Sequence, residues 1–254
     1  MLPALLRSRS YGAPTPFGVT TEDGERLVGA RIGQAGPALL FCHGFLGWHR
    51  KVGIVRFVER LAERFVVYAL DLRGHGASTG VCTFGDRELL DVDATVQLAR
   101  RETGGPVVTF GLSMGGVAVL RQAALRGGID AVVAVSSPAR WDGHTSRAVA
   151  QMRWLSSSDR GRFLARALGA RISTEWGKPE EPEDVIGRIS PTPLILIHGR
   201  DDHVFDEEEA WRLYRRAREP KRLVLASRFG HAEDGLSDRF ADLLAERVSA
   251  VLPE

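Results

Sequence analysis

The chain alternates short apolar runs with longer stretches of helical spacing, and this alternation limits the folds open to it. Continuous apolar runs of about five residues are typical of strands buried on both faces, as in parallel sheets covered by helices. Strand and helix in regular succession predict a mostly parallel, doubly covered α/β sheet built with right-handed crossovers. The expected strands are Leu39–Cys42, Phe65–Leu70, Val107–Gly111, Ala131–Ser136, Leu194–His198 and Leu223–Ala226.

Helical patterns follow these runs, and one segment breaks the rhythm. The expected helices lie near Val52–Glu63, Asp86–Arg101, Val117–Arg126, Glu207–Arg218 and Phe240–Leu252. Residues 18–21 and 26–32 are predicted to form an antiparallel hairpin that turns at Asp23-Gly24. Residues 139 to 190 contain no clear strand, and we interpret them as a small, mainly helical insertion. A length of 254 residues suits a single α/β domain, 1–254, that carries this insertion.

Charge and cysteine content argue against several classes of protein. The formal net charge is +2, which gives no sign of a nucleic-acid partner or of an acidic membrane surface. Cys42 and Cys82 are too few for a disulfide framework or a metal cage. The apolar start of the chain is broken by Pro3 and then by arginines, so it resembles neither a signal peptide nor a membrane span. We therefore expect a cytoplasmic protein.

The central motif is Gly111-Leu-Ser113-Met-Gly115-Gly116, placed directly after an expected strand and directly before an expected helix. A sharp strand-to-helix turn would strain the backbone of Ser113 and expose its hydroxyl at a helix N-terminus, where free N–H groups favour negative charge. Side chains beside such a turn would collide, which explains glycine two residues before and two after. A glycine-rich crossover turn is the structural alternative. The placement favours Ser113 as a nucleophile.

A second short motif, His43-Gly44-Phe45, also follows an expected strand. A tetrahedral intermediate needs two hydrogen-bond donors aimed at its oxygen. The N–H of Met114, the residue after the nucleophile, is a candidate for one donor, and the N–H of Phe45 for the other. Alternatively, His43 packs and Gly44 turns the chain without any chemical role.

A base and an acid must come from elsewhere in the chain. His231 lies in Phe229-Gly-His-Ala-Glu233, between the last expected strand and the last expected helix, so it projects from the same sheet edge as Ser113. Asp201 and Asp202 follow the strand Leu194–His198 at that same edge. The sequence order is then Ser, Asp, His, with the choice between the two aspartates open.

These motifs together resemble the α/β-hydrolase superfamily, in its single-domain esterase, lipase and thioesterase branch. The resemblance spans about Phe17 to Leu252. In family order, the matching segments are His43-Gly44-Phe45, Asp71-Leu-Arg-Gly-His75-Gly-Ala-Ser78, Gly111–Gly116, His198-Gly-Arg-Asp-Asp202 and Gly230-His231. The resemblance implies the α/β-hydrolase fold: a mostly parallel, twisted sheet of about eight strands with helices on both faces and a small helical cap at about 139–190.

The resemblance also implies roles for single residues. The family acid is usually the fourth residue after the histidine of the His-Gly pair, which is Asp202 rather than Asp201. His75 normally holds loops together and is not the base. Phe205-Asp206 stands where the family often has Val-Pro, a departure near the acid. Some members draw the acid from an earlier loop, and Asp142 would be that candidate.

The implied function is a serine hydrolase that cleaves a small-molecule carboxylic ester or thioester through an acyl-enzyme on Ser113. His231 would be the base and Asp202 the acid that orients it, with no metal or organic cofactor. A peptidase, an amidase or an acyltransferase would use the same three residues. A non-catalytic ligand-binding member of the fold is an alternative of a different class, disfavoured because all three candidates are present.

Substrate preference is harder to predict. Five aromatic side chains are candidates for an apolar acyl site, or else they pack the insertion onto the core: Trp48, Trp141, Trp154, Phe163 and Trp176. From residue 140 to 171 there are seven arginines and two aspartates, a net charge of +5. This charge would favour an anionic substrate, such as a coenzyme-A thioester or a phosphorylated ester. A solvated helix face explains it equally well. The oligomeric state is not predicted.

Overall fold

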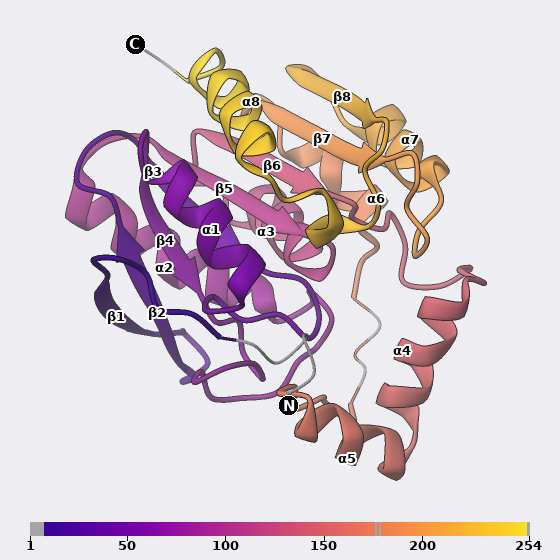
Figure 1. The fold of residues 1–254 in the computed structure, drawn as a ribbon. Coiled ribbons are helices and arrows are strands. Elements are labelled where there is room, and N and C mark those ends of the chain that lie inside the picture. The colour runs from indigo at the N-terminus through magenta and orange to yellow at the C-terminus, as the bar shows by residue number, and fades with distance from the viewer. Residues whose placement is uncertain (1–7, 176, 178, 253–254) are drawn as a thin grey trace.

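The centre of the molecule is one eight-stranded sheet (Figure 1). A computed structural model describes residues 8–175, 177 and 179–252 of the chain. The strands follow the order β1-β2-β4-β3-β5-β6-β7-β8 across the sheet. Their bounds are β1 Thr15–Thr20, β2 Arg26–Ile32, β3 Ala38–Cys42, β4 Val66–Leu70, β5 Val107–Leu112, β6 Ala131–Val135, β7 Leu194–Gly199 and β8 Lys221–Ala226.

Strand directions confirm the expected mostly parallel sheet. β1 and β2 pair in antiparallel fashion and form the predicted N-terminal hairpin at one edge. β2 also pairs with β4 in antiparallel fashion, which joins the hairpin to the rest of the sheet. From β4 through β3, β5, β6 and β7 to β8, every neighbouring pair is parallel. The hairpin turns through Gly24, whose φ of 88° lies in the left-handed region that glycine adopts without strain.

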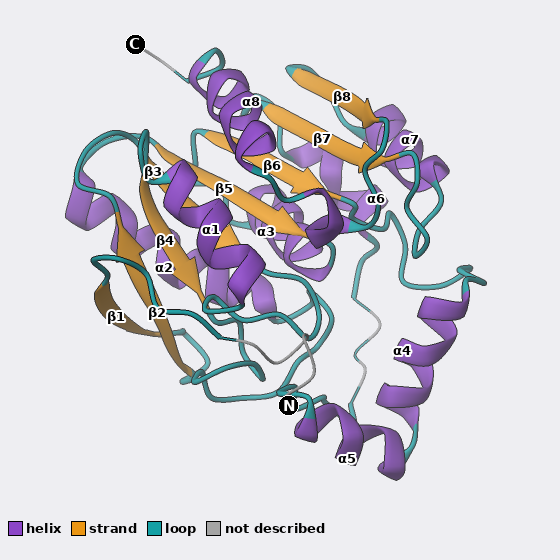
Figure 2. Cartoon of the chain, viewed as in Figure 1, coloured by secondary structure: helices purple, strands orange, loops and turns teal. Residues whose placement is uncertain are grey.

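Helices cover both faces of this sheet, also as expected (Figure 2). One face carries α1 (Val52–Leu61) and α8 (Asp238–Ser249); the other carries α2 (Glu88–Thr103), α3 (Met114–Leu125) and α7 (Glu207–Arg216). Two apolar cores result because alternate side chains of each parallel strand point to opposite faces. In β3, Leu40 packs into the core with α2 and α3, while Phe41 packs into the core with α1 and α8.

Among the helix boundaries that differ from the sequence prediction, the start of α3 bears on the chemistry of the motif at Ser113. α3 begins at Met114, three residues before the expected Val117. The helix starts directly after Ser113, because the glycines of the motif are accommodated in its first turn rather than in a separate loop. The N–H groups of that first turn therefore lie beside the Ser113 hydroxyl.

The expected insertion lies between β6 and β7 and is mainly helical. It contains α4 (Arg147–Ser157), α5 (Asp159–Ala167), α6 (Pro182–Val185) and the 3-10 helix η2 (Ile186–Arg188). α4 and α5 form a hairpin that projects from the body at the lower right of Figure 1. The chain then returns along the loop after β4, with single bridges from Ala170 to His75 and from Ile172 to Cys82. No helix in the described ranges combines the length and hydrophobicity of a membrane crossing.

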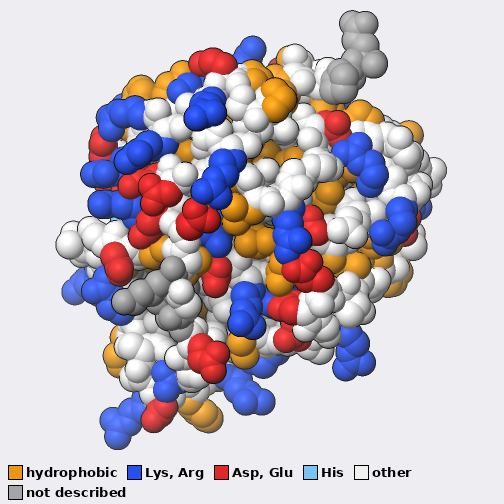
Figure 3. Space-filling model, turned by 180° about the vertical axis from the view of Figure 1, so that it is seen from behind, with side chains coloured by type: hydrophobic (Ala, Val, Ile, Leu, Met, Phe, Trp, Pro, Cys, Tyr) orange, Lys and Arg blue, Asp and Glu red, His pale blue; other side chains and the backbone are white. Residues whose placement is uncertain are grey.

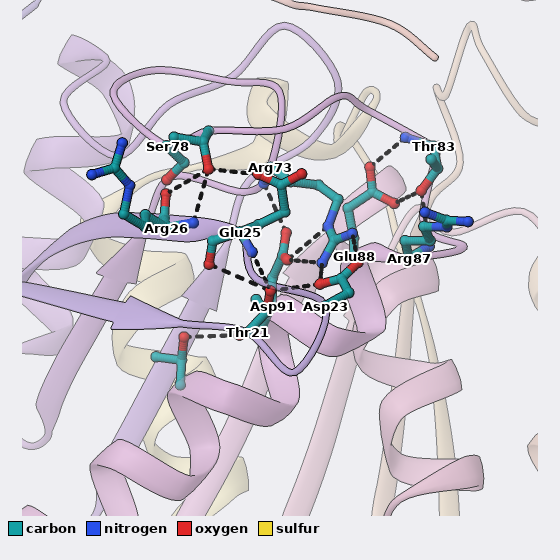
Figure 4. A network of polar contacts seen from close by, with 12 residues as sticks. Thr21, Asp23, Glu25, Arg26, Arg73, Ser78, Thr83, Arg87, Glu88 and Asp91 are labelled. Carbon is teal, nitrogen blue, oxygen red and sulfur yellow. Dashed lines mark hydrogen bonds and ion pairs between the residues drawn. The ribbon is translucent and has the colours of Figure 1, made fainter. Parts of the chain in front are cut away.

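A buried polar network fixes the loop after β4 (Figure 4). The Arg73 guanidinium donates to Asp23 in the β1–β2 turn, at 2.7 and 3.0 Å, and to Asp91 in α2, at 2.8 Å. Glu88 accepts hydrogen bonds from the backbone and hydroxyl of Thr83. Because Arg73, Glu88 and Asp91 are buried, removing a partner of one of them would leave a buried charge uncompensated. The network therefore joins the loop after β4 to the β1–β2 turn and to α2.

Candidate active site

Three side chains from distant parts of the chain form a continuous series of hydrogen bonds at the carboxyl edge of the sheet. Ser113 lies at the end of β5, Asp202 follows β7, and His231 lies in the loop between β8 and α8. The Ser113 Oγ is 3.0 Å from His231 Nε2, and His231 Nδ1 is 2.8 Å from Asp202 Oδ2. A carboxylate can only accept, so Nδ1 carries the proton and Nε2 accepts from the hydroxyl.

The backbone of Ser113 is strained, with φ 51° and ψ −114°. A non-glycine residue in this region persists only when its surroundings enforce it, and such residues concentrate at functional sites. Close backbone approaches on both sides enforce it here. A Cβ on Gly111 would lie 2.2 Å from the carbonyl oxygen of Gly115, and a Cβ on Gly115 would lie 2.4 Å from that of Cys42. Both positions therefore require glycine.

Asp202, rather than Asp201 or Asp142, contacts the imidazole of His231. Its side chain is 1% exposed, and it also accepts from the backbone N–H groups of Val204 and Phe205, at 2.8 and 3.0 Å. Burial alone would raise the pKa of Asp202, but the hydrogen bond and charge of His231, with these two N–H groups, hold the pKa below its ordinary value. Asp201 and Asp142 are both exposed.

Two neighbours missed by sequence reasoning hold His231 in place. The ring of Phe205 packs edge-on against the imidazole, with ring centroids 5.5 Å apart. The Ser136 hydroxyl accepts from the N–H of Ala232, at 3.1 Å, and so ties the His231 loop to the end of β6. The position of Ser136 as the last residue of the predicted strand Ala131–Ser136 was the available signal. Phe205, in the place of the family's Val-Pro, gave no such signal.

Two backbone N–H groups lie beside the Ser113 side chain. Met114 is the first residue of α3, and Phe45 follows Gly44, whose added Cβ would lie 3.4 Å from the Ser113 Cβ. Neither N–H donates a hydrogen bond within the described part of the chain. Two free donors beside a side-chain hydroxyl would stabilise an oxyanion that formed there.

His75 packs against the loop that carries the Phe45 N–H. It is fully buried; its Nδ1–H donates to the carbonyl of Arg73 at 3.0 Å, and its Nε2 faces the N–H of Leu46 at 3.4 Å. Desolvation lowers the pKa of His75 to about 3, so the ring stays neutral and can accept at Nε2. Its ring also packs edge-on against Phe45.

A cavity of about 320 Å³ opens beside Ser113. Hydrophobic side chains from the core and from α4 form much of its wall: Phe45, Phe84, Met114, Val117, Val149 and Met152. Four charged side chains also line it: Arg140, Asp142, Arg153 and Glu175. The cavity therefore offers an apolar interior with no excess of either charge on its wall.

The aromatic candidates from the sequence are dispersed. Trp141 lines the cavity, whereas Trp48 and Trp154 are not among the described residues of its wall. Trp48 instead donates its indole N–H to Ser8, and Trp154 is half-exposed on α4. Trp176 lies outside the described residues. Trp154 does not reach the cavity because Val149 and Met152 occupy the side of α4 that faces it, and the helical repeat places Trp154 on another side.

The chain matches the model of a known protein family over most of its length. The family model described as the alpha/beta hydrolase family matches residues 39–253. The chain belongs to this family. Membership of the alpha/beta hydrolases agrees with the strand order, the turn at Ser113 and the position of the insertion, and it supports hydrolase activity.

Individual relatives agree with this membership. The chain is 34% identical over 244 residues to "Uncharacterized protein YfhR" of Escherichia coli O157:H7, which covers 90% of this chain and 77% of that protein. It is 38% identical over 86 residues to a pimeloyl-[acyl-carrier protein] methyl ester esterase of Chromobacterium violaceum, covering 34% of this chain and 30% of that enzyme. The solved structure of the Pyrococcus furiosus esterase Pf2001 superimposes with a TM-score of 0.74 at 23% identity, covering 95% and 94% of the two chains. That structural likeness shows the fold alone.

Proposed function

We propose that this alpha/beta hydrolase is a serine hydrolase that cleaves a carboxylic ester or thioester through an acyl-enzyme on Ser113. The observation that carries the proposal is the hydrogen-bonded series from Ser113 through His231 to the buried Asp202. A serine hydroxyl is a weak nucleophile unless a base takes its proton, and a base works best when a third group fixes its tautomer. Here an acceptor-only carboxylate lies on the far side of the imidazole.

In the proposed reaction, Ser113 Oγ attacks the acyl carbonyl carbon while His231 Nε2 takes the hydroxyl proton. The oxyanion that forms accepts hydrogen bonds from the N–H groups of Met114 and Phe45. As the carbonyl re-forms, the alcohol or thiol leaves with the proton from His231. Water then attacks the acyl-enzyme, His231 takes its proton, and Ser113 is released with the carboxylic acid. Asp202 stays ionised and stabilises the imidazolium at each stage.

The cavity wall supports an acyl group with an apolar body as the substrate. About 320 Å³ accommodates a small-molecule acyl chain, and much of the wall is hydrophobic. Arg140 and Arg153 are matched by Asp142 and Glu175 on the same wall, so the cavity itself gives no reason to prefer an anionic acyl group. The ester named for the Chromobacterium violaceum relative supports ester over amide cleavage. We further propose that residues 1–254 form a single domain with the cap inserted at about 139–190.

The Ser113→Ala variant tests the role of the nucleophile. We expect the turnover of p-nitrophenyl esters to fall at least about 10⁴-fold, because the nucleophile is lost while the fold is kept. A fluorophosphonate probe is expected to label the wild type and a Ser249→Ala control on α8, but not Ser113→Ala. Undiminished turnover or labelling of Ser113→Ala would rule the proposal out. Absence of labelling in the wild type would favour a binding-only protein instead.

A further inference from the structure

The outward side of the α4–α5 hairpin combines exposed hydrophobic side chains with basic ones. We call this surface the cap patch; it consists of Trp154, Phe163, Leu164, Arg147, Arg160 and Arg166. Seen from behind, the lower end of the molecule, where the hairpin lies, shows hydrophobic and basic side chains next to each other (Figure 3). The two kinds of side chain therefore form one surface.

The hydrophobic part of the cap patch is unusual for this molecule. Six large hydrophobic side chains are exposed in the described part of the chain, and three of them lie on this one hairpin. Phe163 is 77% exposed, Trp154 49% and Leu164 42%. Exposed apolar side chains scattered singly need no explanation, but a cluster on one element marks an interaction surface.

The basic part of the cap patch is equally local. α4 and α5 together carry five arginines and one acidic residue, Asp159, which pairs with Arg162. Arg147, Arg160 and Arg166 form no ion pair with any described residue. The net charge of the whole chain is only +2, so the excess of positive charge belongs to this hairpin.

Folding does not explain the composition of the cap patch. The hairpin is anchored by its opposite side, where Leu155 and Ala165 are buried in a small cluster with Phe45 and Phe84 packed against it. The helices also cross closely at Gly161, since an added Cβ there would lie 2.2 Å from the carbonyl oxygen of Trp154. The outward side chains contribute nothing comparable to this packing.

We propose that the cap patch is a docking surface for an anionic lipid bilayer. Aromatic and aliphatic side chains surrounded by arginines match a surface that presents negative head groups above an apolar layer. A second copy of the chain fits less well, because a two-fold contact would place the same three arginines against each other. An acidic protein would need a preformed pocket for Phe163, whereas a fluid bilayer accepts a projecting hairpin without one.

The cap patch and the cavity lie on different sides of the same helix, α4. Val149 and Met152, on the inner side of α4, line the cavity beside Ser113, while Trp154 lies on the outer side of the same helix. Docking through the outer side would bring lipid-borne esters close to the cavity. This consequence alone rests on the proposed function; the docking surface does not.

Vesicle sedimentation of the full chain tests the proposal. We use the Ser113→Ala background, so that no ester is consumed, and vesicles of phosphatidylcholine with or without phosphatidylglycerol. We expect binding to the anionic vesicles at least about tenfold tighter than to neutral ones, and weaker binding at high salt. Phe163→Ser should weaken it at least about tenfold, and the pair Arg160→Gln and Arg166→Gln about thirtyfold.

The matched control is Leu243→Ser on α8, a side chain 42% exposed on a different element, which should leave binding unchanged. Equal or absent binding to the two vesicle types, or equal loss in the control, overturns the proposal. A dimer in solution that Phe163→Ser converts to a monomer, without vesicle binding, assigns the patch to copy–copy contact and also overturns it. Turnover of soluble p-nitrophenyl acetate by the Ser113 form of each variant checks folding and tests the proposed function separately.

Discussion

The substitution Gly115→Ala tests how tightly the strand-to-helix turn is built against its neighbours. A Cβ at this position would lie 2.4 Å from the carbonyl oxygen of Cys42 and 2.5 Å from that of His43. Reaching the 3.0 Å that real Cβ atoms require means a shift of about 0.6 Å, and ordinary contact at 3.4 Å means about 1.0 Å. Cys42 ends β3, which is paired on both sides, so the strand resists this movement.

Two effects of Gly115→Ala follow from that geometry. Overpacking in a rigid core costs about 1–3 kcal/mol of the free energy of unfolding. The shift also falls on the segment that leads from His43 to Phe45, whose N–H is our proposed second oxyanion donor. Misplacing a catalytic group by about 1 Å costs on the order of 10²-fold in rate. We therefore expect kcat to fall by about 10- to 100-fold.

Urea unfolding and p-nitrophenyl ester kinetics measure the two effects. The matched control is Gly53→Ala in α1, where an added Cβ meets nothing within 4 Å. Because alanine is the better helix former, this control should gain up to about 1 kcal/mol and keep its kcat. A Gly115→Ala variant as stable and as active as the wild type would refute the close approach and the role of this turn together.

Three further substitutions test other parts of the site. Asp202→Asn should lower kcat on the order of 10⁴-fold with little change in stability, because an amide no longer fixes the His231 tautomer; a kcat near the wild-type value contradicts the proposed role. Burial alone would raise the pKa of Asp71, but the hydrogen bond and charge of the buried His49 outweigh burial and lower this pKa to about 2. Its stabilisation is thus complete above the ordinary pKa of 3.8 and is lost as the pH falls towards 2. At pH 7, Asp71→Asn should cost about 2 kcal/mol in urea unfolding, and a penalty that stays constant down to pH 2 would argue against this assignment. His75→Ala removes the ring that packs against Phe45, and we expect kcat to fall about tenfold while KM changes much less. If only the melting temperature falls, the role of His75 is purely structural.

Local chemistry in the sequence was enough to predict the sheet and the residues worth testing. The parallel strands β3, β4, β5, β6 and β7 are buried on both faces, so their apolar runs could be recognised without knowing their neighbours. The motif at Ser113 could be recognised for a similar reason, because Gly111 avoids a close backbone contact with Gly115 within the same turn.

Contacts between distant segments could not be predicted in this way. The helical spacing of α4 is compatible with either side facing the core, and only packing against Phe84 and Phe45 decides that Met152 faces the cavity while Trp154 faces outward. The edge-on contact of Phe205 with His231 likewise depends on two loops that are adjacent only in space.

What the sequence by itself determined is the set of elements and the chemical groups at their ends, because strand burial, helix spacing and turn strain are local properties. The resemblance to the family favoured Asp202, and the tertiary structure places it against His231. The tertiary structure alone decided which aromatic side chains border the cavity and which side of the cap remains exposed. Those outcomes depend on the register and packing of segments as far apart as residues 113 and 231, which no local pattern encodes.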